Sequence, residues 1–125
     1  MLNIYLLFMN IKYAILKILI LLAYADKQFH ENEKKMIIKI SKKNDLPIND
    51  MDNIENEINN SSKSFTTLCL ETIKIIDNEI DRKNTLSLLA QLSVADHIFH
   101  EDEVHTLELI SEHWDMYANS LREYK

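Results

Sequence analysis

The chain has no glycine among its 125 residues and only one proline, Pro47. Glycine normally supplies the positive φ angles of tight β-hairpin turns and the close backbone approach of phosphate-binding loops. Its absence counts against hairpin-rich β folds and against Rossmann and P-loop nucleotide sites. Hydrophobic residues make up 46% of the chain, which is enough for a packed core. Long helices joined by short polar connections fit this composition best.

Two segments of the chain align closely when the sequence is shifted by 70 residues. Across residues 22–46 and 92–116, ten of 25 positions are identical. Chance similarity between helices rarely extends through a loop, so repetition of one helix-loop-helix unit is the better explanation. We place the two repeats at about residues 11–46 and 81–116. The identical pairs are Leu22/Leu92, Ala25/Ala95, Asp26/Asp96, Phe29/Phe99, His30/His100, Glu31/Glu101, Glu33/Glu103, Ile40/Ile110, Ser41/Ser111 and Asp45/Asp115.

Apolar periodicity predicts the helices. One helix over about residues 11–25 is apolar on most sides and is expected to be central, and its repeat is expected over about 81–95. An exposed Ile20/Leu21 patch would indicate a homodimer. The other helices are expected at about 31–44, after Pro47, after a capping Ser64, and at about 101–118. The chain is therefore predicted to be all-α, a single domain over residues 1–125. We expect one compact bundle of about six to seven helices with two pseudo-symmetric helix-loop-helix repeats.

The N-terminal segment from Ile4 to Ala25 is apolar but is not expected to cross a membrane. Asn10, Lys12 and Lys17 interrupt it, whereas a bilayer needs roughly 20 predominantly apolar residues. A signal peptide with a cleavage site at residues 23–25 is the stronger rival. The same junction recurs at residues 93–96, inside the chain, so the repeat explains these residues better. Met1 and Met9 are both candidate starts.

Charge and cysteine content narrow the function. Net charge is −6, carried by the second half, and does not favour nucleic acid as a partner. Cys69 is the only cysteine, so an intrachain disulfide and a cysteine-based zinc site are both impossible. Cys69 lies on an apolar helical stripe and is interpreted as a core residue. A reduced, cytoplasmic location is expected.

The repeated loops contain the most informative residues, Asp26 and Asp96. Each follows a helix C-terminus, where a carboxylate is unfavourable, so a compensating partner is expected. One candidate is the set of free N–H groups of the next helix, and the other is a cation shared with nearby acids. Local chemistry alone favours capping.

The segments His30-x-x-Glu33 and His100-x-x-Glu103 occupy capping-box positions, with His in place of the usual Ser or Thr. The alternative makes these histidines and glutamates metal ligands beside the aspartates. EF-hand, di-iron and zincin patterns are all missing. Phe29 and Phe99 are interpreted as plugs that hold the loops on the core.

The helix expected at about 31–44 is rich in lysine, and its counterpart is acidic. The simplest interpretation is two solvated faces. A second hypothesis gives the basic helix an acidic partner or anionic lipid headgroups. Its lysines are Lys34, Lys35, Lys39, Lys42 and Lys43, and the counterpart carries Glu108, Glu112, His105 and His113.

The phrase from Ala25 to Glu33, preceded by an apolar helix and repeated from Ala95 to Glu103, resembles the signature of the TerB-like tellurite-resistance family. The N-terminal domains of some membrane-anchored DnaJ-like co-chaperones are similar. The resemblance covers about residues 11–118. One departure is clear, because the family's usual glycine is Lys27 in one copy and His97 in the other.

The resemblance implies an all-α fold and acidic sites that bind a divalent metal ion, with no other cofactor. By matching positions, the metal ligands would be Asp26, Glu33, Asp96 and Glu103. It also implies a stress-response or tellurite-resistance role, a protein partner and a cytoplasmic location near the inner membrane face. No nucleophile and base accompany the acids, so we expect a non-enzymatic module. The alternative is a structural, co-chaperone-like adaptor whose acidic loops are helix caps.

Overall fold

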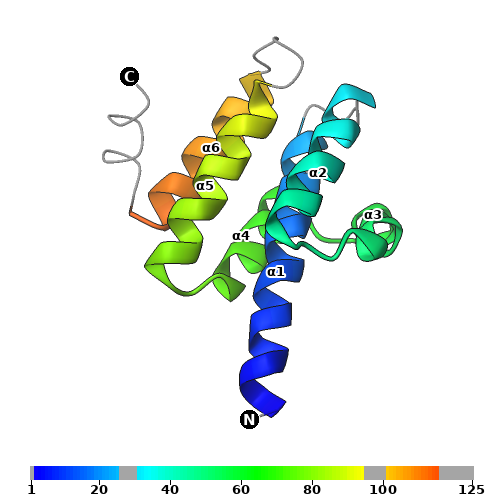
Figure 1. Ribbon diagram of the computed structural model, residues 1–125. Coiled ribbons are helices and arrows are strands. Elements are labelled where there is room, and N and C mark those ends of the chain that lie inside the picture. Colours follow the sequence, from blue (N-terminus) through cyan, green and yellow to red (C-terminus); the bar gives the residue numbers. More distant parts are fainter. Residues whose placement is uncertain (1, 26–30, 95–100, 116–125) are drawn as a thin grey trace.

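The computed structural model describes residues 2–25, 31–94 and 101–115, with side chains from Met9 onward. All regular elements in these ranges are helical, which confirms the predicted all-α class (Figure 1). The elements are α1 (Leu2–Ala23), α2 (Glu31–Asn44), the 3-10 helix η1 (Ile48–Asp50), α3 (Met51–Asn60), α4 (Phe65–Ile75), α5 (Glu79–Ser93) and α6 (Glu101–His113).

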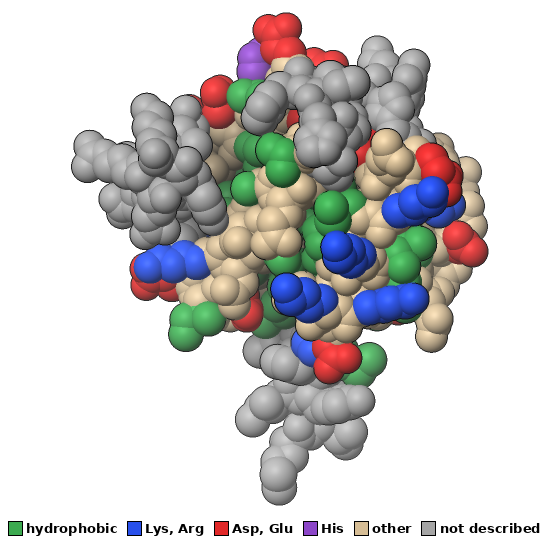
Figure 2. Space-filling model, turned by 45° about the horizontal axis from the view of Figure 1, so that its top comes forward, with side chains coloured by type: hydrophobic (Ala, Val, Ile, Leu, Met, Phe, Trp, Pro, Cys, Tyr) green, Lys and Arg blue, Asp and Glu red, His purple; other side chains and the backbone are tan. Residues whose placement is uncertain are grey.

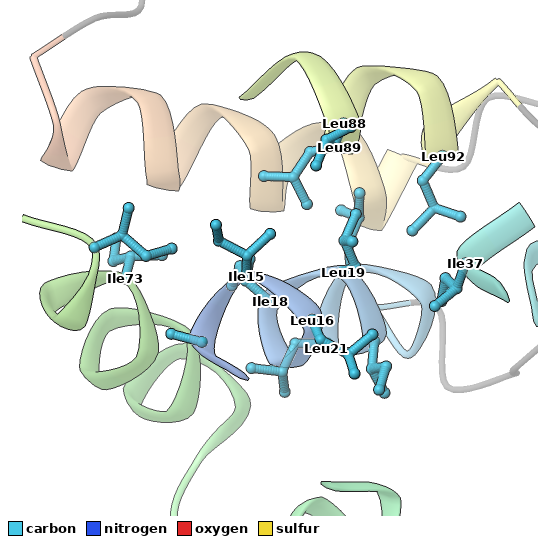
Figure 3. Packing of buried hydrophobic residues seen from close by; sticks show 14 of the residues in the cluster. Ile15, Leu16, Ile18, Leu19, Leu21, Ile37, Ile73, Leu88, Leu89 and Leu92 are labelled. Atoms are coloured by element: carbon cyan, nitrogen blue, oxygen red, sulfur yellow. The ribbon is translucent and has the colours of Figure 1, made fainter. Parts of the chain in front are cut away.

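Helix α1 is the centre of the bundle and contacts each of the other five α-helices. From Ala14 to Ala23 every side chain is buried except that of Lys17, which is half-buried. A helix that is apolar all round is stable only when it is covered on all sides. Figure 3 shows Leu88 and Leu89 of α5 packed over Ile15 and Leu19 of α1. The expected central position of this helix is therefore confirmed.

The structure places Ile20 and Leu21 inside the core of a single chain. Both side chains are 0% exposed. The exposed patch that would have indicated a homodimer is thus absent, because neighbouring helices of the same chain cover it.

Helix α1 begins at Leu2, earlier than the expected start near residue 11. The segment before residue 11 contains no glycine or proline, so nothing in its sequence interrupts the helix. At the other end, the Tyr24 N–H donates to the carbonyls of Ile20 at 3.1 Å and Leu21 at 3.0 Å. Among the described residues, no helix is both long and apolar enough to span a membrane.

Helix α2 ends without glycine in a turn that usually requires it. Asp45 has a φ of 58°, and the Leu46 N–H donates to the Ser41 carbonyl at 3.0 Å. This is the Schellman arrangement, and the buried Leu46 supplies its usual apolar contact. Asp115, which matches Asp45 in the repeat, has a φ of 54° after α6. Aspartate tolerates this left-handed region better than most residues.

Polar caps set the starts of two other helices. Ser64 accepts a hydrogen bond from the Thr67 N–H at 3.1 Å, which confirms the predicted cap of α4. Asn78 accepts one from the Asp81 N–H at 2.9 Å and starts α5 two residues before its expected position. Helix α6 ends at His113 rather than near residue 118.

The predicted apolar stripes face the core with few exceptions. Ile37, Ile40, Ile54, Ile73 and Ile110 are buried, as are the residues grouped with them in one hydrophobic cluster. The expected core residues Met36, Ile58, Phe65 and Leu107 are half-buried and pack against that cluster. Ile48 is half-buried, and Tyr117 lies outside the described residues.

We expect Leu19→Ala to lower the free energy of unfolding by about 2–5 kcal/mol, because it leaves a cavity beside α5 in a well-packed core. Urea unfolding followed by circular dichroism measures this change. The matched control is Ile80→Ala on α5, where the side chain is 74% exposed. That control should change stability by less than about 0.5 kcal/mol. Equal effects of the two substitutions would contradict the central role of α1.

Candidate functional site

Glu33 and Glu103 occupy the third position of α2 and α6 and are almost completely buried. Their exposed fractions are 1% and 2%. Their neighbours Glu31 and Glu101, also in the first turns, are exposed. The same position of the repeated sequence thus holds a buried carboxylate in both helices.

Burial of a carboxylate requires a compensating interaction. An ionised carboxylate loses its hydration on burial, and hydrogen-bond donors or a positive charge must replace it. The free N–H groups and positive dipole at a helix N-terminus can supply part of this compensation. A bound cation can supply it too. Both interpretations derived from the sequence agree with this burial.

The other predicted ligands lie outside the described residues. These are Asp26, Asp96, His30 and His100, together with the plugs Phe29 and Phe99 and the departures Lys27 and His97. In the described part of the chain, no three His, Cys, Asp or Glu residues are grouped so as to hold a metal ion. Glu33 and Glu103 alone therefore do not form a cation site, which would need oxygen ligands from the loops.

A hollow of about 200 Å³ lies next to the residue that precedes Asp26. It lies between the end of α1, the first turn of α4 and the N-terminal half of α6. The spacing of Asp102 and His105 places both on one face of α6. Of these two residues, only His105 belongs to the face that is predicted from the sequence to be solvated. His105 lies 3.9 Å from Glu101, measured from Nε2 to Oε1. The lining residues are Ala25, Phe65, Thr66, Asp102, His105, Thr106 and Leu109.

A second hollow, of about 310 Å³, lies between α2 and the end of α5 and is named here the basic groove. Its lining includes Lys39 and Lys43 of the lysine-rich helix, whose position beside α5 does not follow from the sequence pattern. Figure 2 shows lysine side chains on one face of the molecule, with apolar side chains between them. The groove is lined by Met36, Lys39, Ile40, Lys43, Asn44, Gln91 and Val94.

Cys69 lies in the core, as the sequence predicted, with 0% exposure. Burial raises the pKa of its thiol from an ordinary value of 9.0 to about 12. Reactive cysteines need an accessible thiolate, so this environment is the opposite of a nucleophile site.

These features define a class of protein, an all-α helical module with buried acids in the first turns of two matching helices. A family model described as "Tellurite resistance protein TerB" matches residues 12–122. The match covers nearly the whole chain, so the chain belongs to the TerB family, as its repeated loop sequence indicated. No curated protein and no solved structure matches it.

We expect Cys69 of the folded protein to resist alkylation by iodoacetamide at pH 8. A pKa of about 12 instead of 9.0 lowers the thiolate fraction by roughly three orders of magnitude. Mass spectrometry with and without urea measures the two rates. Rapid labelling without urea would contradict the buried position.

The same pKa shift predicts a pH dependence of stability. Because the pKa is raised in the folded state, the thiol contributes its full stabilisation below pH 9.0. Between pH 9.0 and about 12 the unfolded thiol loses its proton first, so the free energy of unfolding falls as pH rises. Cys69→Ala should reduce this dependence in urea titrations.

Proposed function

We propose that the chain is a non-enzymatic TerB module that binds a divalent cation through its repeated acidic loops and also binds a protein partner. The ligands would be Asp26, Glu33, Asp96 and Glu103. The single observation that carries this proposal is the burial of Glu33 and Glu103 at matching positions of α2 and α6. Membership of the TerB family supports a tellurite-resistance-type role, and a role in stress response is part of the proposal.

Chemistry supports the cation part of this proposal. Carboxylates are hard oxygen ligands suited to Ca²⁺, Mg²⁺ and Mn²⁺. Asp26 and Asp96 follow helix C-termini, where the partial negative charge is unfavourable to an acid but favourable to a cation. Lys27 and His97 occupy the sequence positions at which the family has glycine, and the positive charge of Lys27 would weaken cation binding in the first copy.

The runner-up is a structural adaptor in which the same acids only cap helices. The position of Glu33 and Glu103 in first helical turns favours it, because this is where a capping-box glutamate lies. In this alternative the protein partner is the whole function. Both hypotheses place the chain in the cytoplasm, in keeping with its single cysteine, and place its partner at the inner membrane face by analogy with the family.

Calorimetric titration of the metal-stripped protein with Ca²⁺, Mg²⁺, Mn²⁺ and Zn²⁺ tests the proposal. The test variants are Glu33→Gln/Glu103→Gln and Asp26→Asn/Asp96→Asn. The matched control is Glu31→Gln/Glu101→Gln, which removes two exposed acids from the same helical turns. If the proposal holds, wild type and control give saturable heat. Both test variants should then bind the cation at least about tenfold more weakly. Loss of a residue that only supports a metal ligand already lowers metal affinity by about 10- to 100-fold.

Urea unfolding of the same variants separates the two hypotheses. No heat in any protein, with the two test variants less stable than the control, would select helix capping. Equal loss of heat in control and test variants would indicate unspecific attraction of cations to an acidic surface. Either result rejects the cation site.

A further inference from the structure

The basic groove between α2 and α5 is lined on one side by positive charge. Lys39 and Lys43 are one turn apart on α2, and both are exposed. Neither of these two lysines forms an ion pair with a carboxylate in the described ranges, in contrast to Lys17, Lys63 and Lys83. These two ammonium groups are therefore available to an external anion.

The rest of the lining is apolar or amide. Met36 and Ile40 form the apolar part on α2, and Val94, the residue after α5, is 46% exposed beside them. Asn44 and Gln91 supply side-chain amides, which can both donate and accept hydrogen bonds. A slot with an apolar base, lysines and amides suits an extended or helical peptide better than a simple inorganic anion.

The matching face of α6, in the other half of the chain, is bordered by a further helix. Thr106 and Leu109 of α6 match Met36 and Lys39 of α2 in the repeat. They line a hollow together with Phe65 and Thr66 of α4, and α4 packs against α6. Helix α4 thus brings an aromatic side chain to this face of α6. The corresponding face of α2 opens into the basic groove, whose described lining comes from α2, α5 and Val94, the residue that follows α5.

The charges on the two faces also differ. The positions of Lys39 and Lys43 are Leu109 and His113 on α6. The groove on α2 therefore combines an apolar lining with two lysines that the matching face of α6 lacks. An occupant complementary to it would bring apolar side chains and carboxylates together.

We infer that the basic groove binds an acidic segment of a partner protein, anchored by an apolar side chain between α2 and α5. The volume of about 310 Å³ is at the lower end of ligand-pocket sizes and suits a few side chains. A concave slot fits a peptide, whereas a bilayer presents a broad surface to protruding residues. The inference names the surface and chemistry for the partner in the proposed function, and it does not depend on cation binding.

Fluorescence anisotropy with a panel of labelled nine-residue peptides tests this inference. Each peptide carries four Asp or Glu residues and two apolar residues chosen from Leu, Ile, Phe and Trp. A matched panel has Lys at the acidic positions. We expect members of the acidic panel to bind the wild-type chain, the lysine panel to fail, and added salt to weaken binding.

The decisive variant is Lys39→Glu/Lys43→Glu, and its matched control is Lys35→Glu/Lys42→Glu. The control makes the same charge change on exposed lysines of α2 that do not line the groove. We expect the groove variant to lose at least tenfold in affinity and the control much less. A Lys39→Arg/Lys43→Arg variant, which keeps both charges, should retain binding. Circular dichroism checks that each variant is folded.

Several results would overturn the inference. One is failure of every acidic peptide to bind at millimolar concentration. Another is equal loss of affinity in the groove variant and the control, which would show only the overall charge of α2. Binding of phosphatidylserine vesicles without peptide binding would assign the face to a membrane. Self-association lost in the groove variant, detected by sedimentation, would assign it to a second copy.

Cation titration of the groove variant keeps the two proposals apart. Normal cation heat with lost peptide binding would support a separate partner surface. Cation heat in a wild-type chain that binds no acidic peptide would reject the groove and leave the cation site standing. Binding of the acidic peptides without any heat from cations would support the groove and reject the cation site.

Discussion

The enclosure of α1 is the constraint on which the rest of the structure depends. Nearly every side chain from Ala14 to Ala23 is buried, so this helix has no face suited to water. Five α-helices must surround it, and each needs only one apolar stripe to do so. The surrounding helices are thereby free to vary on their outer faces. The fold and the surface chemistry are consequently specified by different sets of positions.

The two matching helices α2 and α6 show this separation. Their shared positions Glu33/Glu103, Ile40/Ile110 and Ser41/Ser111 are all buried. The outer positions of the two helices differ in charge, and the elements that neighbour the two helices differ too. One face of α6 packs against α4, whereas the corresponding face of α2 borders the basic groove. Because the buried positions are shared and only the outer positions differ, the two helices present different surfaces without a change in their core packing.

Most of the fold could be predicted from the sequence because apolar periodicity and helix caps are local signals. Ser64 and the stripe of α4 are examples. Helix starts were less accurate, since Asn78 was not recognised as a cap and α1 has no local signal for its start. The left-handed Asp45 and Asp115 were identified as a matching pair, but their conformation depends on turn geometry. For the candidate site, the acids were found from the repeat. The basic groove could not be predicted from the sequence. Gln91 and Val94 line it together with Lys39 and Lys43 only because α5 packs against α2.

The enclosure of α1 also has a consequence for biosynthesis. Residues Leu2–Ala23 leave the ribosome before any of their packing partners, and the last of these, α6, ends at His113. At roughly 5–20 residues per second, the apolar helix remains uncovered for several seconds of translation. The nascent chain thus exposes this apolar segment until its packing partners have been synthesised. Any pause in synthesis between Ala23 and the end of α6 therefore prolongs the exposure of this apolar helix.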